Sequence, residues 1–279
     1  MPTKTTRPRQ SDSIYLALVL DPIRACANYK PKFGQGAKGA GLSLEQFQAL
    51  YRADPFYNWF GLDNPLMYAA HKAAGGMTSV YRQIGIGCER LFRTVLRDSL
   101  QLTDEDVTWS YTVPVAGGKV KTLYLDGRVP LDRIPDATRR KQFHEWMRQS
   151  AVTLGVNDKV FETLTGTIFE VRQGYKSKDS KRQNADIANA ATAYTNSYLP
   201  CAAILSAQID SDILLRYRAE KWAVVTGIVG TQAPLLSTYD FMKDVVGYDL
   251  ASFFRRNSTV LRSEVAQVLN ALLLAGDEK

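Results

Sequence analysis

Apolar positions recur with a helical period in several parts of the chain. Between residues 79 and 100 they lie three or four positions apart, at Val80, Ile84, Cys88, Leu91 and Val95. This spacing places them on one face and predicts a long amphipathic helix. A shorter helix is predicted over 65–74, and Gly75 and Gly76 are expected to end it.

Helices are predicted on both sides of this segment. Ser43 and Gln46 have the spacing of a capping box, which indicates that a helix starts at residue 43. From residue 212 to the C-terminus the pattern is mainly helical, beginning with a helix over 212–225.

Alternating and unbroken apolar patterns predict strands in the middle of the chain. Residues 108–115 and 119–129 alternate as strands do, and Ala-Gly-Gly between them suits a tight hairpin turn. Asp126 is expected at the end of the second strand. The strand pattern resumes at 166–175, and residues 201–209 form a nearly unbroken apolar run, typical of a strand buried on both faces.

The order of these elements predicts the fold class. From residue 79 to 208 it is helix, strand, strand, inserted helix, strand, helix, strand, and Pro200 is expected to end the last helix. This order indicates an α/β (α+β) domain, with a mixed central sheet flanked by helices and additional N- and C-terminal helices. Four segments are expected: a disordered basic tail at 1–12, an N-terminal helical region at 13–78, the core at 79–210, and a C-terminal helical region packed on the core at 211–279.

Composition narrows the class of protein. The chain has 279 residues, of which 45% are hydrophobic, and no run of about 20 apolar residues that a membrane span needs. We therefore expect a cytoplasmic protein without a membrane partner. Its three cysteines are odd in number and far apart, so buried reduced thiols are expected rather than disulfides. The net charge of +7 favours polyanionic partners such as nucleic acid.

Two classes of site are disfavoured by the sequence. Residues 34–39 fit G-x-G-x-x-G, but no strand precedes them and no P-loop is present, so no nucleotide cofactor is expected. His71 and His144 are the only histidines, which excludes a multi-histidine metal site.

Two carboxylates form the most informative pattern. Asp126 ends one predicted strand, Glu170 lies near the end of another, and basic residues follow Glu170 at once. Carboxylates on adjacent strands are hard oxygen ligands suited to Mg²⁺, which can activate water and offset charge on a phosphate. The alternative is that Asp126 is a turn residue and Glu170 belongs to a solvated charged rim.

Strand parity indicates which cation accompanies the carboxylates. On an extended strand Arg172 shares a face with Glu170 and lies about 7 Å along, at roughly 3.3 Å per residue. Lys176 also has this parity, but only a bend, for example at Gly174, would return it to the carboxylates. Arg172 cannot release a proton and could only stabilise charge, whereas Lys176 has more chemical options. Both are therefore candidate catalytic residues.

A predicted helix start follows. Ser180 and Gln183 have capping-box spacing, which places cations and amides in a first turn, where a helix N-terminus favours phosphate. Arginine, glutamine and asparagine also read base edges. The candidate DNA-binding residues are Lys178, Lys181, Arg182, Gln183 and Asn184.

These residues resemble the PD-(D/E)XK nuclease superfamily, type II restriction endonucleases in particular, and among them ApaLI-like enzymes. That family's core is a helix, a hairpin carrying Asp, a strand carrying Glu-x-Lys, a helix and a strand, which is similar to residues 79–208. The resemblance implies that Asp126 and Glu170 bind the metal and that Arg172 stands at the lysine position.

The resemblance also has an addition and two departures. In some members a glutamate of the first helix joins the metal site, and Glu89 is the matching residue. No proline precedes Asp126, and Arg172 replaces the usual lysine, so that Lys176 is an alternative to it.

The hypothesis from the sequence is therefore a Mg²⁺-dependent, sequence-specific endonuclease that cuts double-stranded DNA, of the type II restriction class. A homodimer would match a palindromic target. Two alternatives remain: a DNA-binding protein without catalysis, and a structural or interaction protein with a solvated basic rim.

Overall fold

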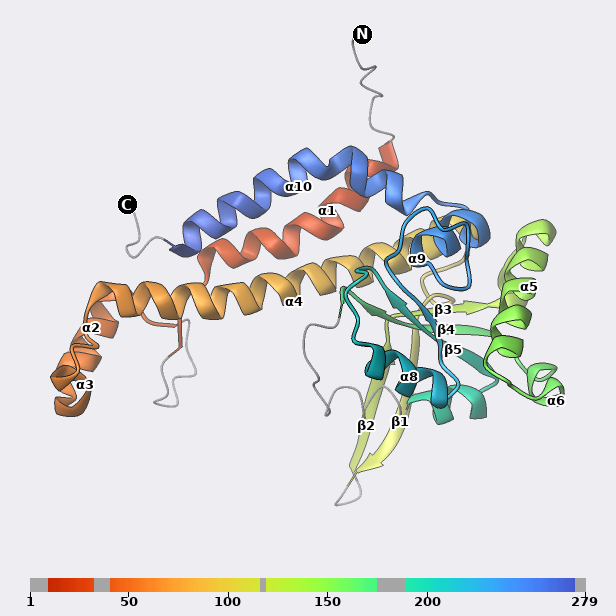
Figure 1. The fold of residues 1–279 in the computed structure, drawn as a ribbon, viewed down its shortest axis with the longest axis horizontal. Helices are drawn as coiled ribbons and strands as arrows, with labels where there is room; N and C mark the ends of the chain where they lie inside the picture. Colours follow the sequence, from red (N-terminus) through yellow and green to blue (C-terminus); the bar gives the residue numbers. More distant parts are fainter. Residues whose placement is uncertain (1–9, 33–40, 116–118, 175–188, 274–279) are drawn as a thin grey trace, which may run out of the picture. The chain divides into compact units, whose positions relative to one another are not determined.

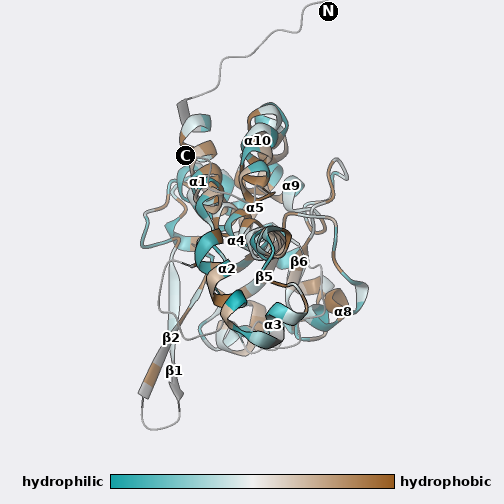
Figure 2. Cartoon of the chain, turned by 90° about the vertical axis from the view of Figure 1, so that its left-hand side faces the viewer, coloured by the Kyte–Doolittle hydropathy of each residue, from teal (hydrophilic) through white to brown (hydrophobic). Residues whose placement is uncertain are grey.

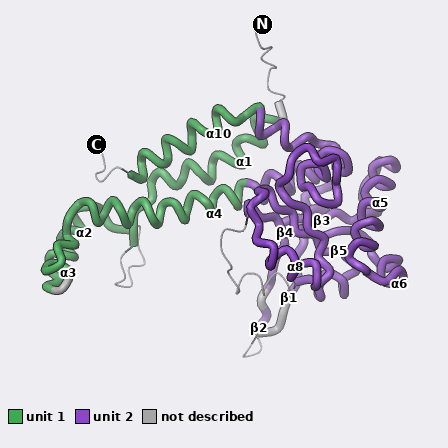
Figure 3. Tube along the Cα trace, in the orientation of Figure 1, with its two compact units in different colours: residues 1–87, 256–279 green, residues 88–255 purple. Residues whose placement is uncertain are grey.

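The structure is a computed structural model that describes residues 10–32, 41–115, 119–174 and 189–273 (Figure 1). The chain divides into two compact units, residues 1–87 with 256–279 (unit 1) and residues 88–255 (unit 2) (Figure 3). The divisions fall inside two helices, α4 (Pro65–Leu100) and α10 (Leu250–Leu273). Within the described ranges, every helix falls short of the apolar length that a bilayer crossing requires.

Unit 1 is built from helices in its described part. Besides the first part of α4 and most of α10, it contains α1 (Gln10–Arg24), η1 (Ala25–Asn28), α2 (Leu44–Ala53) and α3 (Pro55–Trp59). Figure 2 shows hydrophobic and hydrophilic residues interspersed along α1 and α10, as expected of helices with one buried face. The capping box at Ser43 is confirmed, since its hydroxyl accepts from Gln46 N–H and the Gln46 side chain accepts from Ser43 N–H.

Two arginines link α1 and α10 within unit 1. Arg24 donates to both carboxylate oxygens of Glu264, at 2.8 and 2.6 Å. Arg256 donates to Asp12 Oδ2 at 2.8 Å, and Asp12 is only 2% exposed. A buried carboxylate needs such a partner because desolvation without one is costly.

The prediction that Gly75 and Gly76 end a helix is wrong. Helix α4 runs without interruption through both glycines. A side chain at Gly75 would clash with the Tyr29 ring, and one at Gly76 would clash with Leu272. The glycines therefore permit close packing against α4 rather than a helix end, and tertiary contacts outweigh their low helix propensity.

Unit 2 contains the strands and their flanking helices. Its elements after α4 are β1 (Trp109–Val115), β2 (Lys119–Leu125), β3 (Gly127–Pro130), η2 (Leu131–Arg133), α5 (Ala137–Thr153), α6 (Asp158–Phe161), β4 (Gly166–Arg172), a helical segment at 189–195, β5 (Tyr198–Ile204), α8 (Ser211–Ala219), β6 (Ala223–Val225), α9 (Thr238–Asp240) and η3 (Phe241–Val246).

Two sheets form in unit 2. Strands β1 and β2 pair as the predicted hairpin, and its turn at 116–118 lies outside the described residues. The second sheet has the order β3-β4-β5-β6, in which β3 is antiparallel to β4 and the other pairs are parallel. The predicted mixed sheet with flanking helices is thus confirmed.

Helices cover both faces of this mixed sheet. On one face Phe169 of β4 packs against Phe92 of α4, Trp146 of α5 and Phe241 of η3. On the other face, Ala202, Ile204 and Val224 pack against Ala190 of the 189–195 helix and against α8. Side chains alternate between the faces along each strand, so Phe169 and Glu170 point to opposite layers.

Three predicted element bounds need correction. The second strand of the hairpin ends at Leu125, directly before its predicted end at Asp126, but residues 127–129 belong to a separate strand, β3, because the chain bends at Asp126 and passes from the hairpin into the mixed sheet. Residues 212–225 are not one helix: α8 ends at Ala219 and β6 follows. Pro200 lies within β5 instead of ending a helix, and it is tolerated because β6 pairs only from Cys201 onward.

The expectation for the cysteines is confirmed. Cys26, Cys88 and Cys201 are buried free thiols. Burial raises the pKa of each thiol, to about 12 at Cys88, so all three stay protonated and unreactive at neutral pH.

Candidate functional site

The backbone brings Asp126 and Glu170 to neighbouring positions. Gly127 is the register partner of Phe169 in the antiparallel β3/β4 pair, so Asp126 lies opposite Glu170. Asp126 N–H donates to Phe169 O at 3.0 Å, and Asp126 Oδ2 accepts from Val171 N–H at 2.8 Å. These two bonds fix the carboxylate of Asp126 against the C-terminal half of β4.

Helix α4 supports the same bend. Arg93 Nη1 donates to the Asp126 carbonyl oxygen at 3.2 Å. Asp126 lies between β2 and β3, so its carbonyl oxygen accepts a hydrogen bond from this arginine instead of from a neighbouring strand. The amphipathic helix predicted over 79–100 therefore positions the site as well as the core.

Arg172 lies against both carboxylates. Its Nη2 forms an ion pair with Glu170 Oε1, and its Nη1 is 3.9 Å from Asp126 Oδ2. The side chains of Glu170 and Arg172 are 7% and 11% exposed. The prediction from strand parity that Glu170 and Arg172 share a face is confirmed.

The electrostatics of these three side chains follow from their burial. Two carboxylates and one guanidinium are gathered where water is largely excluded, so their mutual interactions are stronger than on the surface. The three side chains together carry a formal charge of −1, which is the sign that a bound cation requires.

The donor set is compatible with Mg²⁺. This ion keeps several of its waters and commonly takes only one or two protein carboxylates. The described residues contain no group of three or more acidic, histidine or cysteine side chains arranged for a metal. Asp126 and Glu170 are two carboxylates that could hold Mg²⁺, with water and substrate oxygens as its other ligands.

Glu89 is not gathered with this pair into such a group. It lies on α4, one turn before Arg93, and residues four apart share a helix face. Glu89 is half-buried. The structure thus places Glu89 on the side of α4 that carries Arg93, and its role as a metal ligand stays a prediction.

Tyr111 of β1 also borders the site, and no pattern in the sequence singles it out. It packs against a cluster of Trp109, Leu125, Ile168 and Ala193, in which Ile168 shares the β4 face with Glu170 and Arg172. Burial raises the pKa of Tyr111, the negative charge of Glu170 raises it further, and a side-chain hydrogen bond with Thr192 lowers it. The hydroxyl group donates to Asn189 Oδ1.

The predicted basic segment lies outside the described residues. This applies to Lys176 and to the candidate DNA-binding residues Lys178, Lys181, Arg182, Gln183 and Asn184. The description ends at Gly174, where a Cβ atom would lie 3.0 Å from Ser206 Cβ. The roles of these residues stay predictions, as does the division between Arg172 and Lys176.

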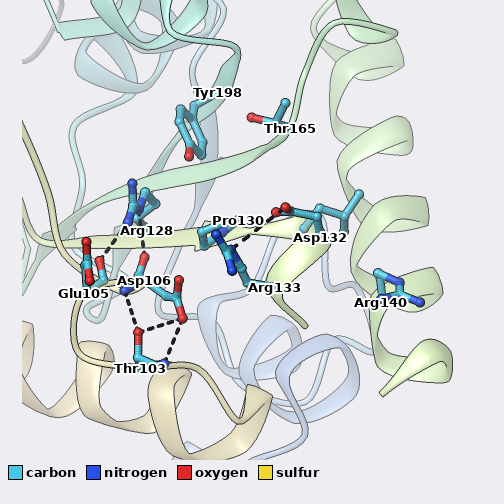
Figure 4. A pocket seen from close by; sticks show the side chains of 11 residues that line it. Thr103, Glu105, Asp106, Arg128, Pro130, Asp132, Arg133, Arg140, Thr165 and Tyr198 are labelled. Carbon is cyan, nitrogen blue, oxygen red and sulfur yellow. Dashed lines mark hydrogen bonds and ion pairs between the residues drawn. The ribbon is translucent and has the colours of Figure 1, made fainter. Parts of the chain in front are cut away.

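A cavity of about 1020 Å³ opens at the other end of the mixed sheet (Figure 4). Pro130 at the end of β3, Thr165 before β4 and Tyr198 at the start of β5 line it. None of the side chains predicted as site residues lines it. Thr165 is five residues before Glu170, or roughly 17 Å along the strand at 3.3 Å per residue.

Two of the three arginines that line this cavity are bonded to backbone carbonyl groups. Arg128 donates to Asp106 O at 2.8 Å and to Glu105 O at 2.7 Å. Arg140 donates to Ile134 O at 3.1 Å. Figure 4 shows Arg128 beside Glu105 and Asp106, with Arg140 apart from them on α5. These bonds hold loops in place, so the cavity is the weaker candidate for chemistry.

Comparisons with family models, with curated proteins and with solved structures find no match. The functional assignment therefore rests on the geometry of Asp126, Glu170 and Arg172.

Proposed function

We propose that the chain is a Mg²⁺-dependent endonuclease that hydrolyses phosphodiester bonds of double-stranded DNA. The observation that carries this proposal is the pair of carboxylates, Asp126 and Glu170, on adjacent strands with Arg172 against both. Paired carboxylates with a cation are suited to phosphoryl transfer, in which negative charge must be offset.

The carboxylates of Asp126 and Glu170 and the guanidinium of Arg172 have separable roles. Mg²⁺ held by Asp126 and Glu170 would supply an activated water and offset charge on the scissile phosphate. Arg172 offsets negative charge that develops on the phosphate, and it does not act as a base because guanidinium keeps its proton. Val171 N–H orients Asp126, so one carboxylate oxygen is fixed by the backbone before substrate arrives.

The order of elements around the pair supports a PD-(D/E)XK-like core. Helix α4, the β1–β2 hairpin, β4 with Glu170-x-Arg172, the 189–195 helix and β5 follow one another as in that family. Asp126 comes directly after the hairpin. In this proposal, the basic segment after Gly174 contacts DNA, and a homodimer cuts a palindromic site in the manner of type II restriction enzymes.

The experiment is a digest of supercoiled plasmid with and without Mg²⁺, read on a gel. We expect cutting by the wild type with Mg²⁺, and a loss of at least about a hundredfold in Asp126→Asn and Glu170→Gln, the scale for removing a group that stabilises transition-state charge. Asp132→Asn is the matched control, because it removes an exposed carboxylate, 78% accessible, from the same unit.

The outcomes separate the candidate functions. Undiminished cutting by both site variants would exclude this site. DNA binding that weakens with salt, without cutting, would indicate a non-catalytic DNA-binding protein. Absence of binding even at low salt would favour an interaction protein with a solvated rim. Discrete fragments from linear DNA would establish sequence specificity.

A further inference from the structure

We propose that Asn189 is a phosphate-binding residue of this site and that Tyr111 is the positioning residue that orients it. The inference rests on the proposed function and extends it to two residues that the two-carboxylate pattern does not include. It starts from the hydrogen bond in which the Tyr111 hydroxyl donates to Asn189 Oδ1, across 78 positions of sequence.

The Tyr111 hydroxyl has one proton to donate, and it has two side-chain partners. A side-chain hydrogen bond with Thr192 lowers the pKa of the Tyr111 phenol. The Tyr111 proton goes to Asn189 Oδ1. Both partners are on the helical segment 189–195, three residues apart and hence on one face.

This bond fixes the orientation of the Asn189 amide. An asparagine side chain has a carbonyl oxygen on one side and two N–H donors on the other. Because Tyr111 engages the oxygen, the amide nitrogen is turned away from Tyr111 as a donor group. A neutral donor of this kind can bind a phosphate oxygen without repelling the cation that the carboxylates hold.

The mixed sheet defines where Tyr111 and Asn189 lie. Tyr111 packs against the cluster formed by Trp109, Leu125, Ile168 and Ala193. Ile168 and Glu170 are two residues apart on β4 and share a face, so Tyr111 lies over the face that carries Glu170. Its pKa also responds to the charge of Glu170.

The Tyr111–Asn189 bond also connects the β1–β2 hairpin with the 189–195 helix. Strand β1 pairs with β2, and Leu125 at the end of β2 directly precedes Asp126. The 189–195 helix covers the layer of Glu170. The Tyr111–Asn189 bond therefore holds the hairpin that leads to Asp126 against the helix beside Glu170.

The test measures both DNA affinity and the cutting rate of full-length variants. Asn189→Asp keeps the shape of the side chain and replaces its N–H donor by an acceptor. We therefore expect the affinity for a DNA duplex to fall at least about tenfold, as for loss of one charge-assisted hydrogen bond. Asn157→Asp is the matched control. Asn157 is exposed and caps α6, where Asp serves equally well, so the same added charge is expected to leave affinity unchanged.

Tyr111→Phe separates positioning from packing, because it keeps the ring and removes only the hydroxyl. We expect kcat to fall about tenfold with little change in unfolding temperature, and the double variant with Asn189→Ala to be no slower than Asn189→Ala alone. Tyr198→Phe is the control, since Tyr198 packs on the same Trp109 ring from β5.

The results decide this inference and the proposed function separately. Full cutting by Tyr111→Phe and full affinity of Asn189→Asp, while the wild type cuts DNA, would overturn the inference alone. If the wild type binds DNA without cutting, the proposed function fails, and weaker binding by Asn189→Asp still supports the phosphate contact. A wild type that neither binds nor cuts DNA overturns both.

Discussion

The two ends of the mixed sheet each bring arginines beside acidic residues, and they do so in different ways. At the C-terminal end of β4, Arg172 forms ion pairs with carboxylates that are largely buried. At the opposite end, Arg128 donates to backbone carbonyl groups, and the Arg133–Asp132 pair is exposed, at 4.0 Å.

This difference separates arginines that support the backbone from the arginine at the proposed site. A guanidinium that binds carbonyl groups keeps its charge, but its N–H donors are used to satisfy the backbone and hold loops in place. A buried carboxylate pair is costly to maintain, since desolvation opposes the charged forms. The open cavity therefore carries less functional information than the charged site at Asp126, Glu170 and Arg172.

The largest expected effect is that of Arg172→Gln on stability. Removing the guanidinium leaves Glu170 buried without this ion pair, and breaking such a pair costs about 3 kcal/mol of unfolding free energy. Urea denaturation measures the loss. If the carboxylates bind Mg²⁺, adding the ion recovers more stability in this variant than in the wild type.

The matched control for this variant is Arg133→Gln at the other end of the sheet. Arg133 is 67% exposed, so its removal changes the free energy of unfolding by less than about 0.5 kcal/mol. Equal destabilisation by the two variants would remove the distinction between the ends of the sheet.

An intermediate effect is expected for Arg128→Met. This change removes the two hydrogen bonds to Glu105 O and Asp106 O, and we expect a loss of about 2 kcal/mol in unfolding free energy. Plasmid cutting should be retained at temperatures where the variant is folded. A variant that is stable and yet inactive would instead indicate that the cavity takes part in function.

The smallest effect concerns pH at the cavity. The backbone N–H and the hydroxyl of Thr103 lower the pKa of Asp106 below its usual value of 3.8. Since the folded pKa is depressed, this contribution to stability is present above pH 4 and is lost as the pH falls through the folded pKa. Unfolding midpoints between pH 6 and pH 3 should show Asp106→Asn losing less stability on acidification than the wild type.

Much of the site was predictable because its determinants are local. The hairpin follows from alternation around Ala-Gly-Gly, and the shared face of Glu170 and Arg172 follows from the period of a strand. The bend at Asp126 was harder to predict, because the same alternation continues through it into β3.

The remaining features depend on contacts between distant segments. Gly75 and Gly76 look like a helix end until Tyr29 and Leu272 pack on them. Strand β6 has three residues, too few for a period to be detected. Tyr111 is one of several aromatic residues in strands, and only the fold brings it to Asn189.

The bend at Asp126 has a consequence for the order of folding. The hairpin before it pairs close neighbours in sequence, whereas the bond from Val171 to Asp126 spans 45 positions and the bond from Tyr111 to Asn189 spans 78. Contacts with long sequence separation require more loop closure and tend to form later. The pairing of β3 with β4 spans similar separations, so the charged cluster forms together with the mixed sheet and not with the local hairpin, and its two carboxylates are buried only when that sheet assembles.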